Sequence, residues 1–99
     1  MAAYLITDAD WKGADRETIL RFGQAVTPVI ARYGGKYLLE RGAVPEPVEG
    51  DWRPPTFSII EFPGVDAIRQ LLASPEFQTA AEIRHHTSAV FRQILVQGV

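Results

Sequence analysis

The only two histidines of the chain, His85 and His86, stand side by side near the end of an expected helix. Histidine titrates near neutral pH, so it can carry protons or bind a metal ion. Neighbours on a helix point about 100° apart, and the chain has no cysteine to complete a zinc site of three or four ligands. We therefore expect no metal site. Two hypotheses stay open: the pair ends the helix, where positive charge is favourable, or His85 transfers protons in catalysis.

Asp8 and Glu61 are the candidate general bases. They are predicted at the ends of two strands that we expect to be adjacent and parallel in the centre of a sheet, so both carboxylates would occupy the same end. Carboxylates brought together raise one pKa, which would suit a base. Alternatively, each is a solvated strand terminus or the partner of a helix start. Tyr4 could share the same cleft, where a buried phenol needs a hydrogen-bond partner.

Arg84 and Trp52 are the candidate ligand-binding residues. If Arg84 faces the sheet, its charged fork needs an anion in a half-buried cleft, which Glu61, Asp8 or a ligand carboxylate would supply. An internal ion pair and a ligand site both stay open. Trp52 lies in a proline-rich segment and could close a pocket as a lid or anchor a second subunit, and we favour the interface.

Residue patterns indicate how these side chains are positioned. Apolar residues spaced by three and four predict a helix over 15–33, ended by the glycine pair at 34–35. A second helix stops and restarts, because Ser74 suits a helix cap and Pro75 suits a first turn. Residues 42–55 hold four prolines and two glycines, which predicts an irregular excursion. The expected strands are 3–8, 36–41, 56–62 and 88–96, and the two parts of the broken helix are 66–73 and 75–86.

The order of these elements is β-α-β-β-α-β, which predicts an α+β, ferredoxin-like domain spanning residues 1–99. Four antiparallel strands would carry the helices on one face. The first and third strands hold apolar residues on both sides, so the other face of the sheet would be apolar and bare. The simplest closure is a two-fold homodimer with the sheets packed together, a dimeric α/β barrel.

Composition limits the partners. An apolar content of 46% with 22% charged residues is typical of a soluble globular domain. The net charge of −2 argues against a nucleic-acid partner, which would need a concentrated positive field. No stretch reaches membrane-spanning length, and the start of the chain lacks the features of a signal peptide. With no cysteine to form disulfides, we expect a cytoplasmic protein.

Several motifs resemble one known family. They are Ala31-Arg32-Tyr33-Gly34-Gly35-Lys36-Tyr37-Leu38, Glu49-Gly50-Asp51-Trp52-Arg53-Pro54, Glu61-Phe62-Pro63, Ser74-Pro75-Glu76-Phe77 and the terminal Gly98-Val99. They follow the order of domain-of-unknown-function family 1330, within the dimeric α/β barrel superfamily. The resemblance carries over no catalytic residue. Because superfamily relatives include cofactor-free monooxygenases, isomerases and haem-degrading enzymes, it implies only a scaffold that often holds a small organic molecule between sheet and helices.

Two functional hypotheses follow. In the first, the protein is a homodimeric enzyme without a bound cofactor that acts on a small organic molecule between the sheet and the broken helix. Tyr4 would then donate a hydrogen bond, Asp8 or Glu61 would act as base, Arg84 would hold an anion and His85 would carry a proton. In the second, the protein is a non-catalytic module that binds a metabolite or simply dimerises, and the same residues form a structural network.

Overall fold

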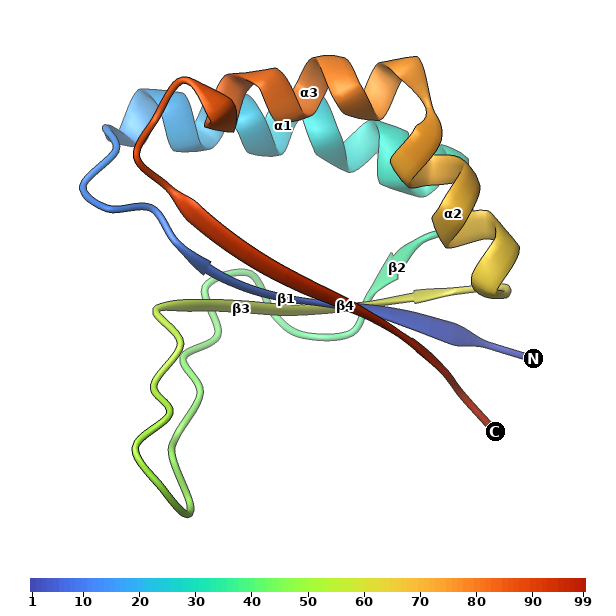
Figure 1. Cartoon of the computed structure of the whole chain (residues 1–99), viewed down its shortest axis with the longest axis horizontal. Helices are drawn as coiled ribbons and strands as arrows, with labels where there is room; N and C mark the ends of the chain where they lie inside the picture. Colours follow the sequence, from blue (N-terminus) through green and yellow to red (C-terminus); the bar gives the residue numbers. More distant parts are fainter.

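A four-stranded sheet carries three helices on one of its faces (Figure 1). The computed structural model describes all residues, 1–99. In chain order the elements are β1 (Ala3–Asp10), α1 (Arg16–Arg32), β2 (Lys36–Tyr37), β3 (Thr56–Phe62), α2 (Val65–Ala73), α3 (Pro75–His85) and β4 (Val90–Gln97). The predicted order of elements and the break in the second helix are confirmed, while β2 is shorter than the predicted strand 36–41.

The strand order is β2-β3-β1-β4, and every neighbouring pair is antiparallel. This is the predicted α+β, ferredoxin-like arrangement. The expectation that β1 and β3 run parallel was wrong. Each helical connection leads to a parallel strand two places along the sheet, so the strand inserted between the two must run the opposite way.

The helix boundaries follow from local hydrogen bonding. Asp15 precedes α1, and its carboxylate accepts a hydrogen bond from the Thr18 backbone N–H at 2.7 Å. Hydrogen bonding with Thr18 lowers the pKa of Asp15. At the break between α2 and α3, the Ser74 hydroxyl accepts from Phe77 N at 3.1 Å and donates to the Leu71 carbonyl at 2.7 Å. Ser74 therefore closes one helix and opens the next, as its position beside Pro75 predicts.

The core lies between the helices and the helix-facing side of the sheet. Its fully buried large side chains are Phe62, Ile68 and Leu71. The turn from α1 to β2 reaches this core: Gly34 has a φ of +84° after the last helical turn, and Gly35 lies against Ile30 and Phe62. Glycine is required at Gly35 because a side chain there would enter space that the core already fills.

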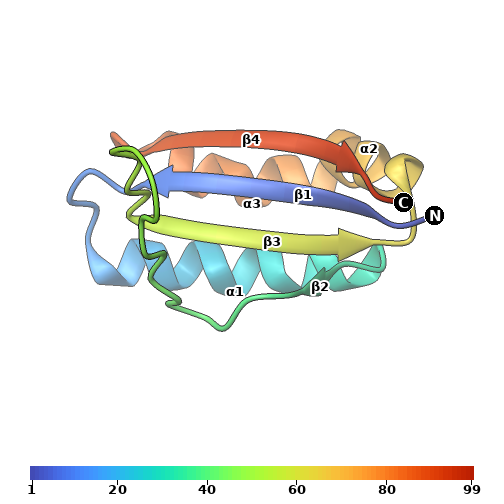
Figure 2. The ribbon, with the colours of Figure 1, turned by 90° about the horizontal axis from the view of Figure 1, so that it is seen from below.

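The opposite face of the sheet has no helix over it. Figure 2 shows this face with the helices behind the strands and with the loop between β2 and β3 crossing one end. In Figure 1 the same loop projects away from the sheet on the side opposite the helices. We call this helix-free side the open face, and residues 42–55 the projecting loop.

Candidate functional site

Side chains on the open face follow from the strand register. Ile6 in β1 lies directly opposite Ile59 in β3 and opposite Ile94 in β4. Successive residues of a strand point to opposite faces of the sheet, and Leu5, the residue before Ile6, points into the core. Ile59, Ile6 and Ile94 therefore form one row across three strands, here called the isoleucine row. Ile94 is 59% exposed, so the row ends in apolar surface open to water.

Asp8 lies two residues further along β1, on the same face and at the end covered by the projecting loop. Its Oδ2 atom accepts a hydrogen bond from Arg92 Nη2 at 2.6 Å and another from the Trp52 indole N–H at 3.1 Å. Asp8 is 9% exposed, and the Trp52 ring packs edge-to-face on Phe57 at 5.7 Å between centroids. The carboxylate thus ties the projecting loop to two strands.

The Asp8–Arg92 pair is expected to contribute to stability. The Asp8 side chain is 12% exposed and that of Arg92 is 72% exposed, so water screens the charge of Arg92 but has little access to that of Asp8. A double-mutant cycle with Asp8→Ala and Arg92→Ala should give a coupling free energy of about 1 kcal/mol in urea unfolding. The matched control is Asp10 and Lys12, 3.3 Å apart with both side chains exposed, where we expect a smaller coupling. Equal coupling in the two cycles would contradict the role of burial.

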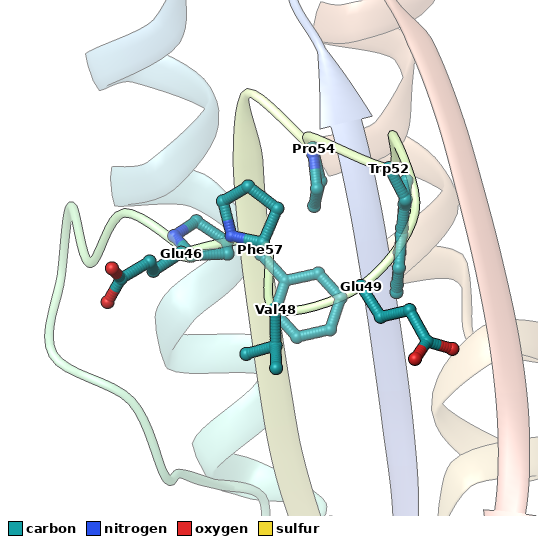
Figure 3. A pocket seen from close by; sticks show the side chains of 8 residues that line it. Glu46, Val48, Glu49, Trp52, Pro54 and Phe57 are labelled. Carbon is teal, nitrogen blue, oxygen red and sulfur yellow. The ribbon is translucent and has the colours of Figure 1, made fainter.

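A pocket lies beneath the projecting loop, beside the cluster of Asp8, Arg92 and Trp52. Its volume is about 230 Å³. Figure 3 shows the Phe57 ring in the middle with Trp52 to one side, while the Glu46 and Glu49 carboxylates lie at opposite edges. The lining residues are Pro45, Glu46, Pro47, Val48, Glu49, Trp52, Pro54 and Phe57. This pocket is on the open face, whereas the expected cleft was between the sheet and the helices.

Glu61 and Tyr4 lie on the open face but away from Asp8. Glu61 is opposite Tyr4 on one side and opposite Lys36 on the other. Asp8 is four residues further along β1 than Tyr4, which corresponds to about 13 Å along a strand. The expected shared carboxylate site was therefore wrong, because antiparallel strands put their ends at opposite edges. The Tyr4 ring packs on the backbone of Gly98, and no hydrogen bond joins it to Glu61.

Arg84 and His85 belong to the other side of the sheet. The Arg84 guanidinium carbon lies 4.4 Å from the centre of the Phe91 ring. An ion pair of Arg84 with Glu61 or Asp8, one of the two alternatives left open by the sequence, does not form, since Asp8 and Glu61 face away from the helices. His85 is the last residue of α3, and its Nδ1 atom lies 4.0 Å from a Glu82 carboxylate oxygen. His86 caps the helix, and its Nε2 atom lies 3.7 Å from the other oxygen of the same carboxylate.

Six residues predicted from sequence thus fall into three places. Asp8 and Trp52 come together, Tyr4 and Glu61 lie opposite each other at the far end of the open face, and Arg84 and His85 lie on the helix side. Sequence reasoning missed Arg92, which holds Asp8. Only the register of β1 against β4 reveals this pair, because 84 positions separate the two residues. No three His, Cys, Asp or Glu side chains are grouped so that they could hold a metal ion.

Comparison with known proteins gives a family and a fold. The model of a family described as "Domain of unknown function (DUF1330)" matches residues 2–99. No protein with a curated description matches the chain. None of the three helices is both long enough and apolar enough to cross a membrane.

Three solved structures have a similar fold. A protein of unknown function from Rhodopseudomonas palustris is 20% identical with a TM-score of 0.76, and the match covers 99% of this chain and 82% of that one. A hypothetical Arabidopsis thaliana protein is 12% identical with a TM-score of 0.65, covering 99% and 88%. A dimeric ferredoxin-like protein of unknown function from Thermobifida fusca is 14% identical with a TM-score of 0.58, covering 95% and 90%.

Proposed function

Since the chain belongs to the DUF1330 family, whose description names no activity, we propose a function from its surfaces: it is a homodimeric module whose two subunits pack sheet against sheet. The isoleucine row carries this proposal. It lies on the open face, with Ile94 59% exposed and Val96 beside it 41% exposed. A contiguous apolar surface on a soluble domain is typical of an association site.

The area of the open face indicates which surfaces of the subunit would form the dimer contact. β1, β3 and β4, spaced by about 4.8 Å and seven or eight residues long, together with the two-residue β2 give a face of about 400 Å². A stable interface buries about 800 Å² on each partner. The projecting loop would supply the difference, because it stands out on the same side and carries Val44, Val48 and Trp52 at 85%, 98% and 58% exposure. We therefore assign both surfaces to the dimer contact.

Charge and precedent also support a second copy as the partner. The open face bears both signs, with Arg92 beside Asp8 and Lys36 opposite Glu61. A surface of mixed sign can meet its own copy around a two-fold axis without net repulsion. The Thermobifida fusca protein of similar fold is described as dimeric.

The catalytic hypothesis has less support from the geometry. It needs a base, an anion-binding group and a proton carrier around one cleft. Asp8 and Glu61 are separated by about 13 Å along the strands, and the sheet itself separates them from Arg84 and His85. The dimerisation and binding hypothesis does not need these residues to converge, so we prefer it.

The solution mass tests the proposal. Sedimentation equilibrium of the full chain at micromolar concentration should give twice the monomer mass of 11.0 kDa. Dilution should shift the mass toward the monomer in a single concentration-dependent step, since dimer formation follows mass action. A mass of 11.0 kDa throughout the micromolar range would contradict the proposal.

A further inference from the structure

Arg84 is a cation without an anionic partner on the helix side of the sheet. Its Nε atom is buried and makes no hydrogen bond. The two terminal nitrogens form no hydrogen bond or ion pair with the chain either, but they are not fully buried. By contrast, Arg32 and Arg92 each lie within 4.0 Å of a carboxylate.

Three aromatic rings form a cluster beside this guanidinium. The centroids of Trp11 and Phe91 are 5.1 Å apart, those of Trp11 and Phe22 5.5 Å, and those of Phe22 and Phe91 5.8 Å. All three contacts are edge-to-face. The rings are half-buried rather than fully buried, so each keeps some apolar surface. The Arg84 guanidinium lies over the Phe91 ring.

We propose that Arg84 and the aromatic cluster of Trp11, Phe22 and Phe91 bind a small organic carboxylate with a flat apolar body. The carboxylate would meet the outer, terminal nitrogens of Arg84 end-on, because the Nε atom is closed off from solvent. Two parallel N–H···O bonds are the geometry that a guanidinium and a carboxylate favour. The apolar body would lie on the exposed parts of the rings.

The surroundings of Arg84 explain why a carboxylate would bind there. Its burial removes water from the charge and lowers the pKa of Arg84. Stacking on Phe91 satisfies one face of the guanidinium, but the donors in its plane have no acceptor within the chain. A carboxylate supplies both the opposite charge and the acceptors. An apolar body suits this site better than a small hydrated anion, because the Phe22 and Phe91 rings offer no hydrogen bonds to replace lost water.

This site is separate from the proposed dimer contact. Ala9, which lies opposite Phe91 in the sheet, is buried on the helix side, whereas Asp8 and Arg92 face the open side. The two tryptophans report on the two sides, since Trp11 packs on Phe91 and Trp52 bonds to Asp8. Failure of one proposal therefore leaves the other intact.

The test is an NMR titration of the full-length protein with sodium benzoate and, separately, with cyclohexanecarboxylate. We expect saturable shifts of the Arg84 Nε–H and Trp11 indole N–H signals, with the Trp52 indole signal unchanged. Benzamide, which has the same shape as benzoate without the charge, should bind about ten- to hundredfold more weakly. The proposal is overturned if neither carboxylate shifts the Arg84 and Trp11 signals saturably, or if benzamide binds as well as benzoate.

Two variants separate binding from packing. Arg84→Gln should weaken benzoate binding about ten- to hundredfold, while the melting temperature without ligand stays equal or rises, because a partly desolvated charge without an anionic partner is removed. Arg69→Gln is the matched control, since Arg69 is an exposed helical arginine in α2 without an ion pair, and should change neither property. Lower melting temperature of Arg84→Gln with unchanged benzoate affinity would mean that Arg84 only packs on Phe91, and would overturn the proposal.

Discussion

Replacing Ile94 with aspartate is expected to convert the proposed homodimer to monomers, with a dissociation constant raised at least about 100-fold. Ile94 ends the isoleucine row and is 59% exposed in the single subunit. In a sheet-to-sheet dimer, two-fold symmetry would bury two introduced carboxylates without partners. Each would cost several kcal/mol of binding free energy. Sedimentation equilibrium of the variant across the micromolar range measures the change.

The control for this variant is Leu20→Asp. Leu20 is 45% exposed on α1, so the chemical change and the starting exposure are similar, but the residue lies on the helical side of the molecule. Leu20→Asp should keep the dimer. Circular dichroism should show that both variants remain folded, because both residues are substantially exposed in the subunit. A monomeric Leu20→Asp beside a dimeric Ile94→Asp would contradict the sheet-to-sheet arrangement and point to the helices instead.

Replacing Gly35 with alanine is expected to lower the free energy of unfolding by about 3 kcal/mol, within the range for overpacked cores. A Cβ atom at Gly35 would lie 2.9 Å from the Ile30 carbonyl oxygen and 2.9 Å from the Phe62 ring, and would overlap the Ile30 side chain. Ile30 is 4% exposed and Phe62 1% exposed, so neither can move aside into solvent. For a domain of this size, the melting temperature should fall by about 10–20 °C.

Gly23→Ala is the control for a glycine without such contacts. Gly23 lies inside α1, and a Cβ atom there would meet nothing within 4 Å. Alanine should stabilise the protein by about 0.5–1 kcal/mol, because glycine is unfavourable in a helix interior. Urea unfolding of both variants at one protein concentration gives the two values. The concentration is fixed because the proposed dimer would make the stability depend on it. Equal effects of the two substitutions would contradict the close packing at Gly35.

Local chemistry made several parts of the fold predictable. The strand Thr56–Phe62 was predicted with the boundaries that the structure shows. The break at Ser74 and Pro75 was also predicted, because a hydroxyl that caps a helix and a ring that suits its first turn act over a few residues. The irregular projecting loop followed from its prolines and glycines.

The candidate site was less predictable because it depends on contacts between distant segments. The choice of Asp8 and Trp52 was useful, yet their partner Arg92 was missed and their expected neighbour Glu61 lies elsewhere. A shift of one residue in strand register would move Asp8, Glu61 or Arg92 to the other face of the sheet. The register of the strands depends on the packing of the whole sheet, and no short sequence motif encodes it.

The sequence by itself therefore determined the elements, their order and the apolar character of both sheet faces, since these depend on residue types at short spacing. The tertiary structure alone decided which polar groups meet. It joined Asp8 to Arg92, separated Asp8 from Glu61 and left Arg84 against Phe91 without an acceptor. The physical reason is that hydrogen bonds and ion pairs act over a few ångströms, and only strand direction and register bring distant residues to that range.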